Sequence, residues 1–152
     1  MTTTFDTRQT ARDGLVALFV ADDSWAKVFG YYPTATEINR EWPLLIINAA
    51  GTLQTMPMLD MSPSIFTYTA TSLVPTEDNV AWETDNASNL TDTLDQTLRQ
   101  IIRDNAAGAG FATLLSFVET PSNVVVTELH GINYITEIRL IEAKLSTGAA
   151  IP

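Results

Sequence analysis

Cysteine is absent from the 152 residues, which excludes disulfides, thiolate nucleophiles and sulfur-ligated metals. Long hydrophobic runs are absent too. The longest, Leu15 to Ala21 and Leu44 to Ile47, fall far short of the ~20 residues that cross a bilayer. No basic segment followed by an apolar run opens the sequence, so we expect no secretory signal. The simplest expectation is synthesis in the cytoplasm, with no membrane as a partner.

Basic residues are scarce. Eight Lys and Arg side chains oppose 18 Asp and Glu, the formal net charge is −10, and the only lysines are Lys27 and Lys144. Affinity for nucleic acid comes largely from neutralising phosphates with Lys and Arg, and no basic cluster occurs in this sequence. We therefore expect the chain to repel polyanions and to make no specific contact with DNA.

Catalytic and metal-binding motifs are also missing. His130 is the only histidine, so it has no second imidazole with which to form a zinc set, and nothing near it supplies a catalytic triad. The acidic stretch from Glu77 to Asp85 lacks the alternating oxygen donors and central glycine of an EF-hand loop. We predict that the chain is not an enzyme and binds no cofactor or metal.

What the sequence does contain is enough apolar material for one core. A chain of this length with 45% hydrophobic and 17% charged residues is typical of a single globular domain, here residues 1–152.

Apolar residues at three- and four-residue spacing predict two helices. The first covers Thr7 to Ala21, and the second covers Ser88 to Asn105 with a cap at Ser88 or Asn89. In the second helix the apolar stripe consists of Leu90, Leu94, Leu98, Ile101 and Ile102. Asp92 and Asp95 are expected in its first turns and Arg99 and Arg103 in its last, as the helix macrodipole favours.

The remaining regular segments have the character of strands. Trp42 to Asn48 is continuously apolar, which predicts burial on both faces, whereas Ser64 to Val74 alternates and predicts a half-exposed strand. Three more β-rich runs follow the second helix, at 111–119, 124–129 and 132–145, with Gly131 as a corner. Residues 25–41 are expected to be irregular. This order predicts an α+β fold, a mixed or antiparallel sheet of about four to five strands with the two main helices on one face.

Two segments are predicted to project as loops. Residues 51–63 contain Met56, Met58 and Met61, and residues 75–87 contain Trp82 among the acidic residues Glu77, Asp78, Glu83 and Asp85. Flexible methionines and an isolated tryptophan suit contact with a partner, although a loop folded over its own core would use them equally well. We predict that the three methionines and Trp82 form a subunit or partner interface.

The order of elements resembles the tail terminator proteins of long-tailed bacteriophages. The resemblance spans nearly the whole chain: an N-terminal helix leads into Trp42-Pro43-Leu44-Leu45-Ile46-Ile47, then come a long excursion, a strand, the helix Ser88 to Asn105 and a terminal β-hairpin. It implies a structural protein of the virion neck, made in the host cytoplasm, that forms a ring, usually a hexamer, between the tail tube and the head connector. DNA would pass through the ring without specific binding.

In such a ring the resemblance and the charge together suggest that Glu77, Asp78, Glu83 and Asp85 line or approach the lumen, where acidic side chains repel phosphate. Two alternatives stay open. Another neck or tail protein, such as a head-completion, stopper or tube subunit, would share this composition. A small-molecule binding module would be indicated by a deep pocket between the two projecting loops.

Overall fold

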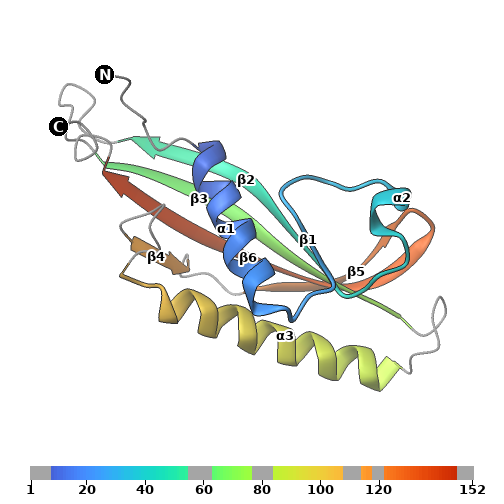
Figure 1. Ribbon diagram of the computed structural model, residues 1–152. Coiled ribbons are helices and arrows are strands. Elements are labelled where there is room, and N and C mark those ends of the chain that lie inside the picture. Colours follow the sequence, from blue (N-terminus) through green and yellow to red (C-terminus); the bar gives the residue numbers. More distant parts are fainter. Residues whose placement is uncertain (1–7, 55–62, 77–83, 108–113, 118–121, 147–152) are drawn as a thin grey trace.

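The computed structural model describes residues 8–54, 63–76, 84–107, 114–117 and 122–146. The fold is α+β, as predicted, and these described residues form three helices and six strands instead of four to five strands (Figure 1). The helices are α1 (Arg8–Asp22), α2 (Ala35–Ile38) and α3 (Thr84–Asp104). The strands are β1 (Lys27–Phe29), β2 (Leu44–Gln54), β3 (Pro63–Pro75), β4 (Leu114–Phe117), β5 (Asn123–Leu129) and β6 (Ile132–Ser146).

All six strands belong to one mixed sheet. Its order is β1-β2-β3-β6-β4, and β5 pairs with β6 beyond the segment that β4 occupies. Only the β1–β2 pair is parallel; β2–β3, β3–β6, β4–β6 and β5–β6 are antiparallel. β6 is therefore the strand on which the sheet is organised, with β3 along one edge and β4 and β5 along the other.

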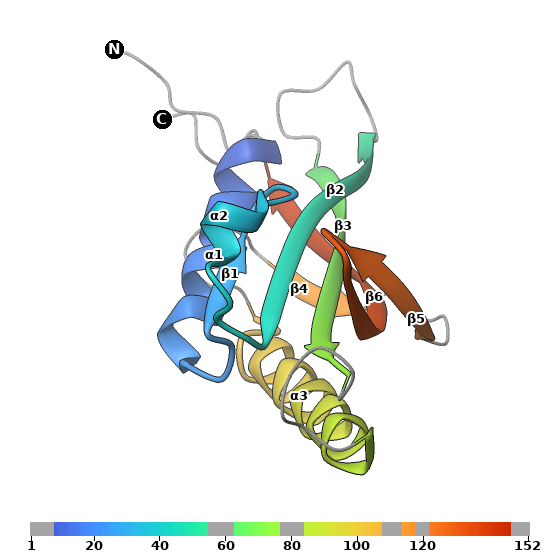
Figure 2. The ribbon, with the colours of Figure 1, turned by 90° about the vertical axis from the view of Figure 1, so that its right-hand side faces the viewer.

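The two long helices cover one face of the sheet, as predicted (Figure 2). Leu15 and Phe19 from α1 and Leu94 and Ile102 from α3 are buried in one cluster with side chains of the four strands β2, β3, β4 and β6. The alternation predicted for β3 is confirmed at Phe66, Tyr68 and Ala70, which all point into this cluster. The predicted half-exposure is wrong for residues 71–75, which are all buried because both faces of the sheet are covered there. Trp25 also lies there, and its indole nitrogen donates to the Ser72 hydroxyl at 3.2 Å.

A smaller cluster lies on the opposite face under α2, and consists of Ile38, Leu44, Ile46, Leu73 and Tyr134. Successive residues of β2 alternate between the two clusters: Leu45 and Ile47 face α1 and α3, whereas Leu44 and Ile46 face α2. All four are completely buried. This arrangement confirms the prediction of burial on both faces and explains the unbroken apolar run.

Residues 25–41 are more regular than predicted. They contain β1 and the short helix α2, whose start has a capping box: the Thr34 hydroxyl accepts from the Glu37 backbone N–H, and the Glu37 carboxylate accepts from the Thr34 backbone N–H. The prediction failed because a three-residue strand and a one-turn helix are too short to show periodicity.

The bounds of the two predicted loops are also corrected. β2 continues to Gln54 and β3 begins at Pro63, so both ends of the 51–63 segment are strand. α3 begins at Thr84 within the predicted acidic loop, so Asp92 and Asp95 lie beyond its first turns. The polar residues between Thr84 and Ser88 lack the apolar spacing by which the helix was recognised. Arg103 does lie in the last turn, as predicted.

An ion pair joins α3 to β6. The Asp95 carboxylate accepts from both Nε and Nη2 of Arg139, the second at 3.0 Å, and its Oδ2 lies 3.1 Å from Nε of Arg99. The Asp95 side chain is only 12% exposed and that of Arg139 21%. Hydrogen bonds between charged groups at this depth are among the stronger polar contributions to stability.

We predict that Asp95→Asn lowers the free energy of unfolding by about 1–3 kcal/mol, because the half-buried Arg139 guanidinium loses its nearest charged partner and keeps only Glu137, at 3.8 Å. Urea unfolding measures the change. Asp92→Asn, an exposed substitution on the same helix, is the control and should change stability by less than about 0.5 kcal/mol. Equal effects of the two substitutions would contradict a role for the ion pair in holding α3 on the sheet.

Candidate assembly strand and adjoining pocket

β5 is the most exposed strand that the structure describes. Val124, Val125 and Val126 are 57%, 37% and 68% exposed, and every residue of β5 except Leu129 is exposed. Val124 and Val126 pair with Glu137 and Ile135, whereas Val125 pairs with Thr136 on the other face. Valine therefore meets solvent on both faces of the strand.

The geometry of β5 follows from its hairpin with β6. Leu129 pairs with Ile132, leaving a two-residue turn in which His130 and Gly131 both have positive φ, 53° and 79°. Such turns match the twist of paired strands, and glycine adopts this conformation without strain. Gly131 is thus the corner that the sequence predicts. The hairpin pairs one edge of β5 with β6, and no described strand pairs with the other edge.

An exposed apolar strand edge is a site for pairing with another chain. Its free backbone N–H and C=O groups form a template, and native edges are usually protected by charged residues, proline or a covering element. Glu128 is the only charged residue of β5, and the three consecutive valines are exposed, with no described strand or helix covering them. β5 is therefore a candidate surface for strand addition or side-chain docking.

A histidine bond holds the tip of this hairpin. Nε2 of His130 lies 2.8 Å from the Pro33 carbonyl oxygen. Because a carbonyl only accepts, Nε2 must carry the hydrogen and donate. The single histidine thus links the β5–β6 turn to the segment before α2, and it has no acidic partner among the described hydrogen bonds and ion pairs.

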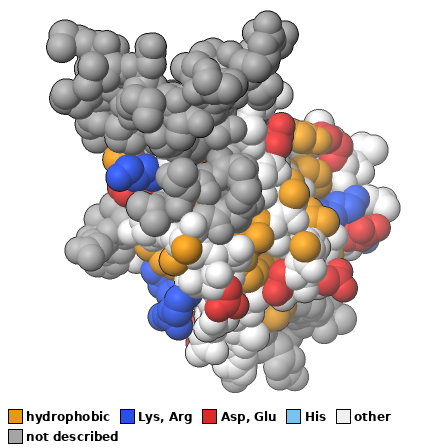
Figure 3. All heavy atoms as spheres, turned by 60° about the vertical axis from the view of Figure 1, so that its left-hand side comes forward, with side chains coloured by type: hydrophobic (Ala, Val, Ile, Leu, Met, Phe, Trp, Pro, Cys, Tyr) orange, Lys and Arg blue, Asp and Glu red, His pale blue; other side chains and the backbone are white. Residues whose placement is uncertain are grey.

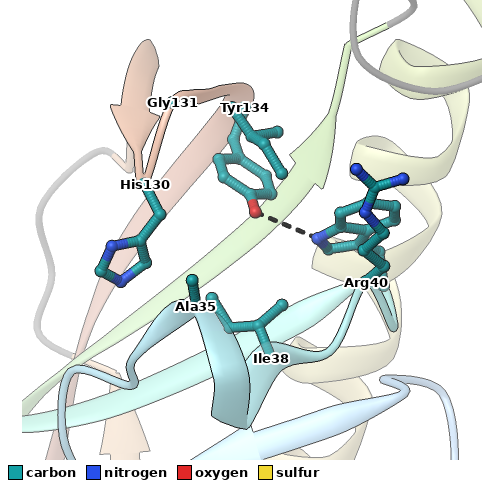
Figure 4. Close-up of a pocket in the computed structure, with 8 residues that line it drawn as sticks. Ala35, Ile38, Arg40, His130, Gly131 and Tyr134 are labelled. Atoms are coloured by element: carbon teal, nitrogen blue, oxygen red, sulfur yellow. Dashed lines mark hydrogen bonds between the residues drawn. The ribbon is translucent and has the colours of Figure 1, made fainter.

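Beside the turn is a pocket of about 410 Å³ (Figure 4). It is lined by Ala35, Ile38, Arg40, Trp42, His130, Gly131, Ile132 and Tyr134. The Trp42 indole N–H donates to the Tyr134 hydroxyl at 3.0 Å, drawn as the dashed line in Figure 4. Burial raises the pKa of the Tyr134 hydroxyl, while the bond from Trp42 acts in the opposite direction.

The described lining of this pocket is aromatic and cationic. It offers two aromatic rings, one guanidinium and an imidazole already bonded to Pro33, with no carboxylate among its described residues. In the part of the chain that the structure describes, no three His, Asp or Glu side chains gather closely enough to hold a metal ion.

The predicted site residues fall mainly outside the described residues. This holds for Met56, Met58, Met61, Glu77, Asp78, Trp82 and Glu83. Asp85 lies in the first turn of α3, and its side chain is not described. The interface and lumen assignments of these eight residues stay predictions. On the face shown in Figure 3, acidic side chains are interspersed with hydrophobic ones.

The exposed surface of β5 was not predicted. The signal in the sequence is Val124-Val125-Val126, but three successive β-branched residues ordinarily indicate a strand buried on both faces. The three valines are exposed because β5 lies at the edge of the sheet.

Comparison of the chain with protein-family models and with curated proteins found no match. None of the described helices is both long and apolar enough to span a membrane.

We predict that Tyr134→Phe lowers the free energy of unfolding by about 0.5–1.5 kcal/mol near neutral pH, because the Trp42 N–H loses its acceptor. The difference from wild type should shrink above pH 10.0, the ordinary pKa of tyrosine. A tyrosine whose pKa is raised by folding contributes its full stability below the unfolded-state pKa. This contribution is lost as the pH rises through the folded-state pKa. Urea unfolding across this range measures both effects. Tyr32→Phe, at a site 69% exposed, is the control, and a difference independent of pH would contradict the effect of burial on Tyr134.

Proposed function

We propose that this chain is a structural subunit that assembles with copies of itself into a closed ring, and that the ring is the tail terminator in the neck of a long-tailed bacteriophage. The observation that carries the proposal is the unprotected apolar edge of β5. An edge of this kind is an aggregation hazard in a monomer, so its natural state is a contact with another chain.

The chain's charge supports the same proposal. A net charge of −10 disfavours indiscriminate association, so only a contact with good apolar complementarity brings two copies together. In a ring through which DNA moves, acidic side chains at the lumen would prevent phosphate from adhering. The order of elements resembles that of tail terminators, and this resemblance suggests to which assembly the ring belongs. Its partners would be the tail tube and the head connector.

A neighbouring neck or tail protein is the nearest alternative within the same virion. A head-completion subunit and a tube subunit would use the same exposed strand, and they differ in what they build. A terminator forms single closed rings, whereas a tube subunit forms stacks.

The pocket beside the β5–β6 turn supports a second candidate, a small-molecule binding module. Its volume lies at the lower end of the range for ligand sites, and Trp42 and Tyr134 would provide aromatic contact with an organic ligand. Ligand-induced stabilisation of the monomer, without any change of mass, would favour this candidate over ring assembly.

We predict that light scattering over a range of concentrations finds a ring-sized species with a defined number of subunits, and that negative-stain images show single closed rings. Concentration should shift the balance between monomer and ring because association follows mass action. Stacked tubes would indicate a tube subunit instead. A monomer at every concentration, indifferent to tail tube, would contradict the proposal.

We also predict that neutralising Glu77, Asp78, Glu83 and Asp85 together, to Gln or Asn, slows DNA passage through the neck and leaves ring formation intact. The reason is that phosphate would no longer be repelled from the lumen. The rate of DNA ejection from particles carrying the variant is the measurement. Neutralising Asp22, Asp23, Asp92 and Asp104, which lie on or beside α1 and α3, removes the same charge and is the control. Loss of the ring in the first variant would assign the four residues to an interface instead.

A further inference from the structure

A second apolar surface lies at the edge of the sheet formed by β1. A groove of about 530 Å³ runs between α1 and β1. Its apolar lining consists of Val16, Ala17 and Val20 from α1 together with Val28, Phe29 and Tyr31 from β1 and the residues that follow it. Val20 is 54% exposed and Tyr31 53%, and the Phe29 and Tyr31 rings pack edge to face with centroids 5.7 Å apart.

The groove and β5 lie at opposite edges of one sheet. The strand order runs from β1 through β2, β3 and β6, and β5 pairs with the far side of β6. In Figure 2, α1 and β1 lie on one side of the molecule and β5 on the other. Two different surfaces placed in this way can contact each other only between copies, and such a contact is head to tail. Repeated with a constant rotation, it forms a ring when the rotation brings the last copy back to the first, and an open filament when it does not.

Strand directions suit the contact. β1 is parallel to β2, and each later step, to β3, β6 and β5, reverses the direction. β5 is consequently antiparallel to β1. A neighbouring copy related by rotation about an axis along the strands brings its β1 edge beside β5 in antiparallel orientation, the arrangement that strand addition uses most readily.

The side chains also fall on matching faces. Val126 pairs with Ile135, which packs against the core cluster under α1 and α3, so Val124 and Val126 point to the helix-covered face of the sheet. The groove opens on the same face, because α1 forms one of its walls. If β5 extends the neighbour's sheet, these two valines meet Ala17 and Val20 of the neighbour's α1.

Charge is compatible with this arrangement. Glu128 shares the face of Val124 and Val126, and the groove carries the Arg12 guanidinium beside Asp13. β5 pairing with β5 of a second copy is the competing contact. It would cover β5 but leave the α1–β1 groove open, and it forms only dimers because it joins identical surfaces.

We infer that β5 of one copy docks in the α1–β1 groove of the next, with Val124 and Val126 as the inserted side chains. This contact rests on the proposed ring and assigns its subunit interface to two named surfaces. Aromatic and aliphatic side chains at the centre, with single charges at the rim, are the composition expected of such an interface.

The test uses Val126→Glu and Ala17→Glu, each of which places a carboxylate at an exposed position of one surface. Gln96→Glu, on the exposed side of α3, adds the same charge elsewhere and is the control. Light scattering should find rings for wild type and control, and monomers for both interface variants. Circular dichroism verifies that each variant is folded.

Mixing the two interface variants discriminates between the contacts. A Val126→Glu chain keeps an intact groove and an Ala17→Glu chain keeps an intact β5, so a head-to-tail contact predicts a heterodimer that cannot grow further. Rings from both variants would overturn the inference and leave the proposed ring standing. Failure of the mixture to form the heterodimer would overturn it, and homodimers of the Ala17→Glu chain alone would favour β5 pairing with itself.

The absence of cysteine permits a second test that does not depend on the strength of assembly. Mild oxidation of mixed Ala17→Cys and Val126→Cys chains should yield mainly the heterodimer, and the Ala17→Cys/Val126→Cys double variant should yield a ladder of multimers. Gln96→Cys in place of Ala17→Cys is the control. Mainly homodimers, or a yield no higher than the control, would overturn the contact. Wild-type chains that stay monomeric at every concentration, together with cysteine variants that never cross-link, would overturn the proposed function as well.

Discussion

The structure depends on the antiparallel pairing of β3 with β6, which continues without a register shift from Pro63↔Ser146 to Pro75↔Tyr134. Every later strand is attached through β6: β4 pairs with residues 141–144 and β5 with residues 132–138. Side chains of β6 also enter both clusters, Ile141 and Ala143 under the long helices and Tyr134 under α2. The β3–β6 pairing joins β1, β2 and β3 to β4, β5 and β6. The β5–β6 hairpin therefore depends on it for its attachment to the rest of the sheet.

The same pairing links the core to the candidate surfaces. Arg139 of β6 holds Asp95 of α3, and its guanidinium also lies 5.7 Å from the centre of the Phe117 ring of β4. At the other end of β6, the β5–β6 turn is tied to Pro33 by His130 and lines the pocket with Trp42 and Tyr134. β5 is thus a solvent-exposed strand held by its pairing with β6 and by the His130 contact, which reduces the ordering cost of docking.

The sequence predicts the parts of the fold in which one pattern extends over many residues. The apolar stripes of α1 and α3, the alternation of Phe66, Tyr68 and Ala70 and the doubly buried Leu44 to Ile47 are all confirmed. The pattern is too short to recognise in β1 and α2, and polar residues conceal the true start of α3 at Thr84. For the candidate site, Gly131 marked the turn and the run 124–129 predicted a strand, but nothing in it predicted the exposure of Val124 to Val126. Their exposure depends on sheet order, a long-range property that no local pattern contains.

Hydrogen exchange at the backbone amides of β5 tests the central claim most directly. Amides that do not bond to β6 exchange freely in a monomer and become protected when another chain covers the strand. We expect these amides, together with the β1 segment, to gain protection as concentration rises and the ring forms, while the exposed face of α3 does not change. Rapid exchange along β5 in an assembled particle would contradict the claim that this strand joins the subunits.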